Sequence, residues 1–259
     1  MNVLGMVFSG IKKIFKGPNA LLKHVCIFAI AGFISVATIN IQNAGKDPTP
    51  DISAFITCFI TLLIVSIYMS GYIYQFLHNF FYEEKEEYLP EIDLVPIKRF
   101  FSALPLVLCW GAYNFLALGL VILCFASQNI ALMILGSILS ILLALAYSFI
   151  QFIFVAFSKN FDKRGLFNIL LPFQYLKYSF ADIVILGIVF IPIYILAMIP
   201  SGAAGLAIGL TGAITNQDMG TSSTLIGGIL GGYFGTIVQY IWNYCAVQIY
   251  KEKIEPNMI

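Results

Sequence analysis

Side chains able to carry acid–base or nucleophilic chemistry are scarce in this sequence and form no recognisable catalytic motif. The 259 residues include two histidines, His24 and His78, and the densest group of acids is the run Glu83-Glu84-Lys85-Glu86-Glu87. Catalysis requires acids, bases, nucleophiles or metal ligands within reach of one another, and the patterns of zinc proteases, serine hydrolases and phosphate-binding loops are absent. We therefore expect no enzymatic activity, no cofactor and no metal site. Residues 83–87 are expected to be a solvated loop, the alternative being a site for a basic partner or a cation.

One polar patch is expected inside an apolar stretch. Trp110 and Asn114 are four residues apart, which places them on one face of a helix, and Tyr113 lies beside them. An indole N–H and a carboxamide both need hydrogen-bond partners in lipid. Side chains on the following apolar stretch that can supply partners are Ser137, Ser140 and Tyr147. The patch predicts either a polar contact between two helices or a pocket for a neutral or lipidic ligand.

A glutamine followed by an aromatic residue recurs near the ends of three apolar stretches. The glutamines are Gln75, Gln151 and Gln239. A basic or amphipathic segment precedes each pair of apolar stretches, at residues 1–23, 94–100 and 163–178. This pattern predicts a surface segment followed by a helical hairpin, repeated three times along the chain. The alternative is that glutamine beside an aromatic residue is a general interfacial anchor and that the three matches arise by chance.

Glycines recur at every fourth position in the last third of the chain. The members of this pattern are Gly205 and Gly209, then Gly227, Gly231 and Gly235, with Gly228 and Gly232 repeating the spacing. Small residues at this spacing allow two helix backbones to approach closely in lipid. We therefore expect direct packing between residues 203–214 and 225–235, the alternative being a glycine-rich ligand loop.

Two prolines interrupt the apolar stretch that precedes these glycines. Pro192 and Pro200 each lack a backbone donor, and proline kinks or ends a helix. We expect a separate half-helix at residues 203–214, too short to span a membrane. Such a half-helix is either part of a substrate site, as in some transporters, or a structural kink or external cap.

The chain that positions these residues is too apolar for a water-soluble domain. Hydrophobic residues make up 60% of the sequence and charged residues 10%, whereas soluble domains have about 25% charged residues. Five stretches of 22, 31, 59, 35 and 32 residues contain no Asp, Glu, Lys or Arg. Because a helix needs about 20 apolar residues to cross a bilayer, they predict a single all-α membrane domain with six crossings. The expected crossings are residues 25–42, 53–80, 101–126, 130–157, 181–199 and 224–250.

The distribution of basic residues predicts the orientation of these crossings. Of 14 Lys and Arg residues, 13 fall in the connections and termini on one side, and Lys46 alone falls on the other. Positive residues are retained in the cytoplasm, so we expect a multi-pass protein of the cytoplasmic (inner) membrane with both termini inside the cell. The net charge is only +1, so we expect no nucleic-acid partner.

The first 23 residues are predicted to form a cytoplasmic amphipathic segment. One helical face would carry apolar side chains, and three lysines would lie away from it. The apolar side chains are Leu4, Phe8, Ile11 and Phe15, and the lysines are Lys12, Lys13 and Lys16. A helix of this kind lies in the headgroup layer and attracts anionic lipid, so membrane lipids are expected partners.

From Gly71-Tyr72 to Leu89-Pro90-Glu91-Ile92-Asp93, the chain resembles the membrane-protein family catalogued as domain of unknown function 4013. The resemblance rests on a Gly-Tyr helix end and a Leu-Pro-Glu loop, and it covers about 25 residues. It departs from the family pattern at Ile92, Leu94 and Val95, where an aromatic residue and further acids are expected. The resemblance implies a six-helix bacterial or archaeal membrane protein, and it implies no enzymatic activity and no known substrate.

These observations favour a non-catalytic, permease-like or scaffold subunit that handles lipid, a neutral solute or a protein partner. The predicted crossings contain a single Asp, Glu, Lys or Arg, which is Asp182 at the very start of the fifth, and this scarcity argues against a proton relay within the chain. The alternative is a membrane-anchoring subunit of an enzyme complex whose catalytic residues lie on another chain. A protein partner or a second copy of the chain is expected in either case.

Overall fold

The protein is described here from a computed structural model that covers residues 2–17, 19–44, 52–82, 89–215 and 219–258. Seven α-helices occupy most of these residues, and the described part contains no strand. The helices are α1 (Val3–Ile14), α2 (Ala20–Ala44), α3 (Ile52–Phe81), α4 (Val95–Ala126), α5 (Ile130–Asn160), α6 (Leu171–Thr215) and α7 (Gly220–Ile249). A π-helical turn, η1 (Tyr250–Ile254), and a 3₁₀ turn, η2 (Glu255–Asn257), follow α7.

Six of these helices, α2 to α7, are long and apolar enough to cross a membrane. The all-α fold with six membrane-spanning helices is thus confirmed. The helices extend beyond the predicted crossings where local signals allow it. The fourth helix begins at Val95 instead of Phe101 because Asp93 Oδ1 accepts a hydrogen bond from the Val95 backbone N–H, at 2.9 Å. Pro96 then occupies the first turn of the helix, where no backbone donor is needed.

The sixth helix is continuous, and the expectation of a separate half-helix at residues 203–214 is wrong. It runs from Leu171 to Thr215 through both Pro192 and Pro200. A proline removes one hydrogen bond, and contacts with a neighbouring helix can offset that loss. Here Ser201, the residue after the second proline, donates a hydrogen bond to the Gly227 carbonyl of α7 at 2.6 Å. The 45 residues of α6 extend over about 68 Å, more than twice the thickness of a hydrocarbon core.

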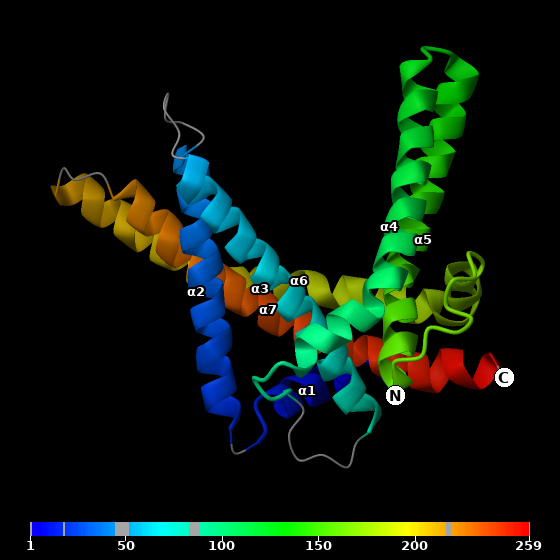
Figure 1. Ribbon diagram of the computed structural model, residues 1–259, viewed down its shortest axis with the longest axis horizontal. Helices are drawn as coiled ribbons and strands as arrows, with labels where there is room; N and C mark the ends of the chain where they lie inside the picture. Colours follow the sequence, from blue (N-terminus) through cyan, green and yellow to red (C-terminus); the bar gives the residue numbers. More distant parts are fainter. Residues whose placement is uncertain (1, 18, 45–51, 83–88, 216–218, 259) are drawn as a thin grey trace.

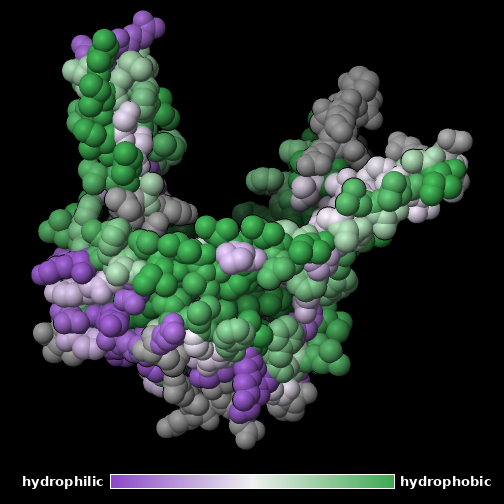
Figure 2. All heavy atoms as spheres, turned by 180° about the vertical axis from the view of Figure 1, so that it is seen from behind, coloured by the Kyte–Doolittle hydropathy of each residue, from purple (hydrophilic) through white to green (hydrophobic). Residues whose placement is uncertain are grey.

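The six long helices form three antiparallel hairpins, α2–α3, α4–α5 and α6–α7 (Figure 1). The hairpins meet at the end of the molecule that carries α1, η1 and η2, which we call the charged end. Away from it the hairpins separate, and the outer half of α4–α5 extends away from the other helices. Hydrophilic residues gather over the charged end and at the tip of α4–α5, and apolar residues cover the surface between them (Figure 2). The shape leaves much of each hairpin open to surrounding lipid.

The buried core lies near the charged end and is rich in aromatic side chains. Its fully buried members include Phe76, Phe80, Phe149, Phe152, Phe157, Tyr175, Tyr240 and Tyr244. By contrast, apolar side chains in the outer half of α4–α5 are exposed, with Phe115 at 78% and Leu116 at 69%. Apolar side chains facing lipid carry no hydrophobic penalty, so the outer halves of the hairpins do not need a shared core.

The first helix, α1, lies against the C-terminal half of α7. Ser9 Oγ and Tyr244 Oη are 3.0 Å apart, and the buried face of α1 includes Met6 and Ile14. The four apolar residues predicted to share a face are all exposed on the other side of the helix. They are Leu4, Phe8, Ile11 and Phe15. The helix therefore has two apolar faces, one packed on the bundle and one open.

Candidate functional site

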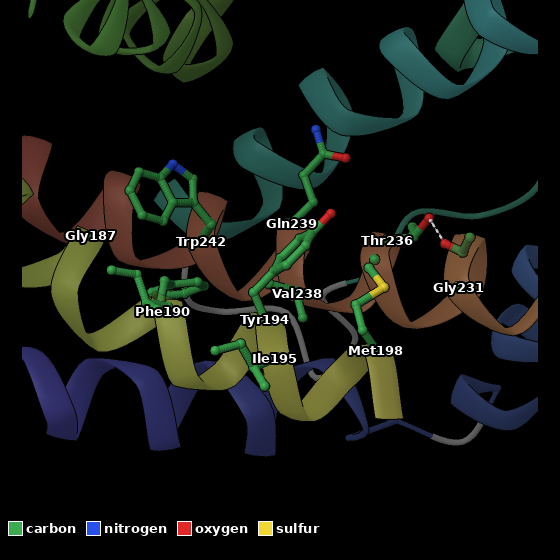
Figure 3. A pocket seen from close by; sticks show the side chains of 13 residues that line it. Gly187, Phe190, Tyr194, Ile195, Met198, Gly231, Thr236, Val238, Gln239 and Trp242 are labelled. Carbon is green, nitrogen blue, oxygen red and sulfur yellow. Dashed lines mark hydrogen bonds between the residues drawn. The ribbon is translucent and has the colours of Figure 1, made fainter. Parts of the chain in front are cut away.

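The largest of the pockets described below is a cleft between α6 and α7, shown in Figure 3. Its volume is about 830 Å³, within the range of small-molecule sites. Its lining is mainly apolar and includes no charged residue. The side chains that line this α6–α7 cleft are Phe190, Ile191, Tyr194, Ile195, Met198, Thr236, Val238, Gln239 and Trp242, together with glycines on both helices. Three of the polar ones, Thr236, Gln239 and Trp242, follow one another along α7 toward the charged end.

Glycines create the space in this cleft. Gly187, Gly231 and Gly235 line it and contribute no side chain. A Cβ atom placed at Gly187 would meet no atom within 4 Å, whereas one at Gly231 would lie 3.3 Å from Ser201 Oγ. Gly231 therefore lies at the contact between α6 and α7 and at the edge of the cleft at the same time.

The glycines lie at the contact between α6 and α7, but the two predicted segments do not pack on each other. Gly205 meets Ser223, and Gly227 and Gly231 meet Ser201, so each glycine set contacts the other helix just outside the segment predicted as its partner. Gly205 accepts a hydrogen bond from Ser223 Oγ at 3.0 Å, and Gly227 accepts one from Ser201 Oγ at 2.6 Å. At each of these bonds a glycine on one helix faces a serine on the other, so only a small side chain separates the two backbones. Gly209 takes no part in the contact, because a Cβ atom there would meet nothing within 4 Å.

The second glycine pair on α7 packs against α2, a partner that the sequence pattern did not identify. A Cβ atom at Gly228 would lie 2.9 Å from Ser35 Oγ, and one at Gly232 would lie 3.2 Å from Ala31 Cβ. The two glycine sets thus lie on adjacent faces of α7 and bring it close to two different helices. The spacing of small residues predicts close approach, but it contains no information on the identity of the partner.

The polar patch on α4 lines a second pocket, of about 350 Å³, with residues of α5. Trp110, Asn114 and Gln151 supply its polar atoms. The Trp110 indole donates a hydrogen bond to the Leu166 carbonyl at 3.1 Å, and the Asn114 amide donates to the Trp110 carbonyl at 2.9 Å. Tyr113 packs edge-on against Trp110, with the ring centroids 5.8 Å apart.

The two serines on α5 that were expected as partners of this patch do not bond to it. Ser137 and Ser140 each donate to a carbonyl one turn earlier in their own helix, Met133 and Gly136, because a hydroxyl in lipid can satisfy itself locally. The side chain of Tyr147 lies outside the described residues.

The three repeated glutamines have three different environments. Gln75 accepts a hydrogen bond from Arg99, Gln151 accepts one from the Trp242 indole at 2.6 Å, and the exposed Gln239 lines the α6–α7 cleft. Trp242 therefore connects the α6–α7 cleft to Gln151 of the second pocket. The segments before the three hairpins differ as well, since α1 is a separate helix, whereas residues 95–100 and 171–178 are the first turns of α4 and α6. The threefold repeat therefore remains a prediction.

A third pocket, of about 210 Å³, lies among α3, α5 and α7 and is also lined by Gln151. The Asn243 amide faces it, and its buried Nδ2 has no hydrogen-bond partner among the described residues. The three pockets thus surround the point where the hairpins meet, and their polar groups include four carboxamides and two indoles.

The histidines occupy structural positions at the charged end. His24 Nε2 lies 3.3 Å from the Ile14 carbonyl, and its Nδ1 lies 3.3 Å from Tyr233 Oη. His78 Nδ1 lies 2.9 Å from the Ser158 carbonyl. Over the described ranges, no group of three or more His, Cys, Asp or Glu side chains is placed to hold a metal ion. The predicted acidic loop 83–87 lies outside the described residues.

The residues that carry the family resemblance are held together in the fold. Tyr72 Oη donates a hydrogen bond to the Pro90 carbonyl at 3.0 Å, and Lys23 Nζ donates to the Leu89 carbonyl at 2.8 Å. Comparison with known proteins finds no matching family model, no similar curated protein and no similar solved structure. Membership of the family catalogued as domain of unknown function 4013 therefore stays a prediction.

Proposed function

We propose that this integral membrane protein is a non-catalytic, permease-like or scaffold subunit that binds lipid in the α6–α7 cleft. The observation that carries the proposal is the chemistry of the cleft, which is apolar along α6 and has polar side chains toward the charged end. An acyl chain matches the apolar part, and the ester or headgroup oxygens of a lipid match the amide N–H groups of the exposed Gln239. A charged solute would find no opposite charge in the lining.

The same reasoning supports the cellular placement that we propose. The charged end gathers most of the basic residues of the described helices and turns, and positive residues favour the cytoplasmic side. We therefore place the charged end in the cytoplasm, with the hairpin tips on the opposite side of a bacterial inner membrane.

Tryptophan fluorescence provides a direct test of lipid in the cleft. The chain has two tryptophans, and one of them, Trp242, lines the cleft. In a Trp110→Phe background, Trp242 is the single reporter. The full chain in mild detergent is titrated with a phospholipid that carries brominated acyl chains, which quench an indole on contact. Saturable quenching at about one lipid per chain is expected.

Two glycines on α6 provide a matched pair of variants for this titration. A Cβ atom meets nothing within 4 Å at either Gly187 or Gly209, but only Gly187 lines the cleft. Gly187→Leu is expected to fill the cleft and weaken quenching, while Gly209→Leu leaves it unchanged. Linear, non-saturating quenching, or equal behaviour of the two variants, would refute the proposal and favour a neutral solute or a protein partner.

A further inference from the structure

Arg99, in the second turn of α4, is held in one orientation by a carboxamide relay. Its Nε donates a hydrogen bond to Gln75 Oε1 of α3 at 3.0 Å. The same glutamine donates from Nε2 to Asn79 Oδ1, one turn along α3, at 3.3 Å. Because the glutamine oxygen accepts from the arginine while its nitrogen donates to Asn79, the orientation of the carboxamide is fixed. The relay thus leaves the two terminal amino groups of the guanidinium available on the opposite edge.

An aromatic ring covers one face of this guanidinium. The Arg99 Cζ atom lies 3.6 Å from the centroid of the Phe161 ring. Phe161 ends α5 with φ 57°, in the left-handed region that bulky side chains rarely adopt. The His78 ring packs on Phe161 as well, with the centroids 4.7 Å apart. Phe161 therefore has a strained backbone conformation, and its ring is packed between Arg99 and His78. The fixed ring restricts the motion of the Arg99 side chain, so less side-chain entropy is lost when a ligand binds.

The charge of Arg99 is not neutralised by the described part of the chain. Two other basic side chains at the charged end have acidic partners, in the pairs Lys159–Glu255 and Arg164–Asp162. Arg99 is half-buried, and among the described residues no carboxylate lies within ion-pair distance of it. Partial burial of an unpaired charge is unfavourable, so an anion at this position would be bound favourably.

We propose that Arg99 is a binding site for a phosphate group at the charged end of the hairpins. The planar fork of a guanidinium matches two oxygens of a phosphate, and such charge-assisted pairs are among the strongest hydrogen bonds in proteins. Arg99 lies two residues before the predicted start of the third crossing, at the depth of lipid headgroups. The phosphate can therefore come from a phospholipid headgroup or from soluble phosphate. The site is separate from the α6–α7 cleft and does not depend on the function proposed above.

The test compares ligands with and without phosphate on the full chain in mild detergent. The probes are phosphatidylglycerol, diacylglycerol, which lacks the phosphate, and inorganic phosphate. Binding is measured as the ligand-dependent rise in the thermal unfolding midpoint and as lipid retained in native mass spectrometry. Phosphatidylglycerol or inorganic phosphate is expected to stabilise the protein, and diacylglycerol is not. Stabilisation by phosphatidylglycerol alone assigns the site to a lipid, and stabilisation by inorganic phosphate as well assigns it to phosphate in general.

The two arginines of the chain provide the matched variants. Arg99→Gln is expected to weaken phosphate binding about tenfold or more, since hydrogen bonds to charged groups contribute about 1.5–3 kcal/mol. Arg164→Gln, at a 94% exposed and acid-paired arginine, is expected to bind as the wild type does. Arg99→Lys keeps the charge but loses the fork, and Gln75→Leu releases the arginine from the relay; both are expected to give intermediate affinities.

Three results would overturn the proposal. They are wild-type affinity in Arg99→Gln, an equal loss in Arg164→Gln, and equal stabilisation by diacylglycerol. If Arg99→Gln does not fold, Arg99→Lys and Gln75→Leu decide the matter, and wild-type affinity in both would count against the site. Because Trp242 quenching reports on the α6–α7 cleft alone, failure at Arg99 and failure of the lipid cleft are distinguishable.

Discussion

The closest backbone approach around any described glycine lies between α3 and α4, and replacing Gly71 by alanine tests its importance. A Cβ atom at Gly71 would lie 1.8 Å from the Pro96 carbonyl oxygen and 2.5 Å from its carbonyl carbon. Real Cβ atoms essentially never come within 3.0 Å of another group. The two helices must therefore separate by about 1.2 Å, the difference between these distances, because the obstacle is backbone and cannot rotate away.

The size of the effect follows from two opposing contributions. Overpacking against a rigid neighbour costs about 3 kcal/mol, the upper end of the usual range. Alanine is favoured over glycine in a helix by about 1 kcal/mol, which offsets part of that cost. The free energy of unfolding should therefore fall by about 2 kcal/mol. At roughly 2–4 °C per kcal/mol for a chain of this size, the unfolding midpoint should fall by roughly 4–8 °C.

Thermal unfolding of the detergent-solubilised protein, followed by intrinsic tryptophan fluorescence, measures this change. The matched control is Gly119→Ala on α4, where a Cβ atom meets nothing within 4 Å. The control should gain the helix preference without the clash and unfold at the wild-type temperature or slightly above it. If Gly71→Ala is as stable as Gly119→Ala, the tight contact with Pro96 is not a feature of the protein, and the reasoning fails.

Other predictions test the remaining contacts and the orientation. Ser201→Ala removes the hydrogen bond to the Gly227 carbonyl and should lower the free energy of unfolding in denaturant titrations by about 1 kcal/mol; no change would show that this bond does not stabilise the contact between α6 and α7. Trp110→Phe removes an indole bond to a backbone carbonyl and should cost about 1 kcal/mol in the same assay, while wild-type stability would contradict the bond. For orientation, a membrane-impermeant maleimide should label the exposed Ser222→Cys on intact cells and Asn257→Cys only after permeabilisation, and the reverse pattern would invert the topology.

The helix boundaries illustrate which local signals can be read from the sequence. The start of the fifth helix at Ile130 is predictable because Asn129 caps it, accepting hydrogen bonds from the backbone N–H groups of Ala131 and Leu132. The path of α6 through Pro200 is not predictable in the same way. Proline disfavours a helix locally. The contact that compensates for it here joins Ser201 to Gly227 of α7, which lies 26 residues further along the chain.

The candidate sites show the same division. The sequence pattern identifies Trp110 and Asn114 as a polar patch and Gln151 as a repeated anchor near a helix end, and two pockets are lined by members of this set. The pattern does not identify the α6–α7 cleft, because a glycine spacing that predicts contact does not reveal where the contact opens into a cavity. Arg99 also escapes notice, since its role depends on meeting Gln75 and Phe161, which lie 24 residues before it and 62 residues after it.

The sequence by itself determined that this protein lies in a lipid bilayer, that it is all-helical and that it has six helices able to cross the membrane. These properties depend on transfer of each segment from water to lipid and on backbone hydrogen bonds within that segment, so they are local. The tertiary structure alone decided that α7 packs on α2 with one glycine face and on α6 with the other, and that Arg99 meets a glutamine and an aromatic ring. In lipid, apolar surface gains nothing from choosing one helix over another. The partners are therefore set by shape and by a few hydrogen bonds between residues far apart in the chain.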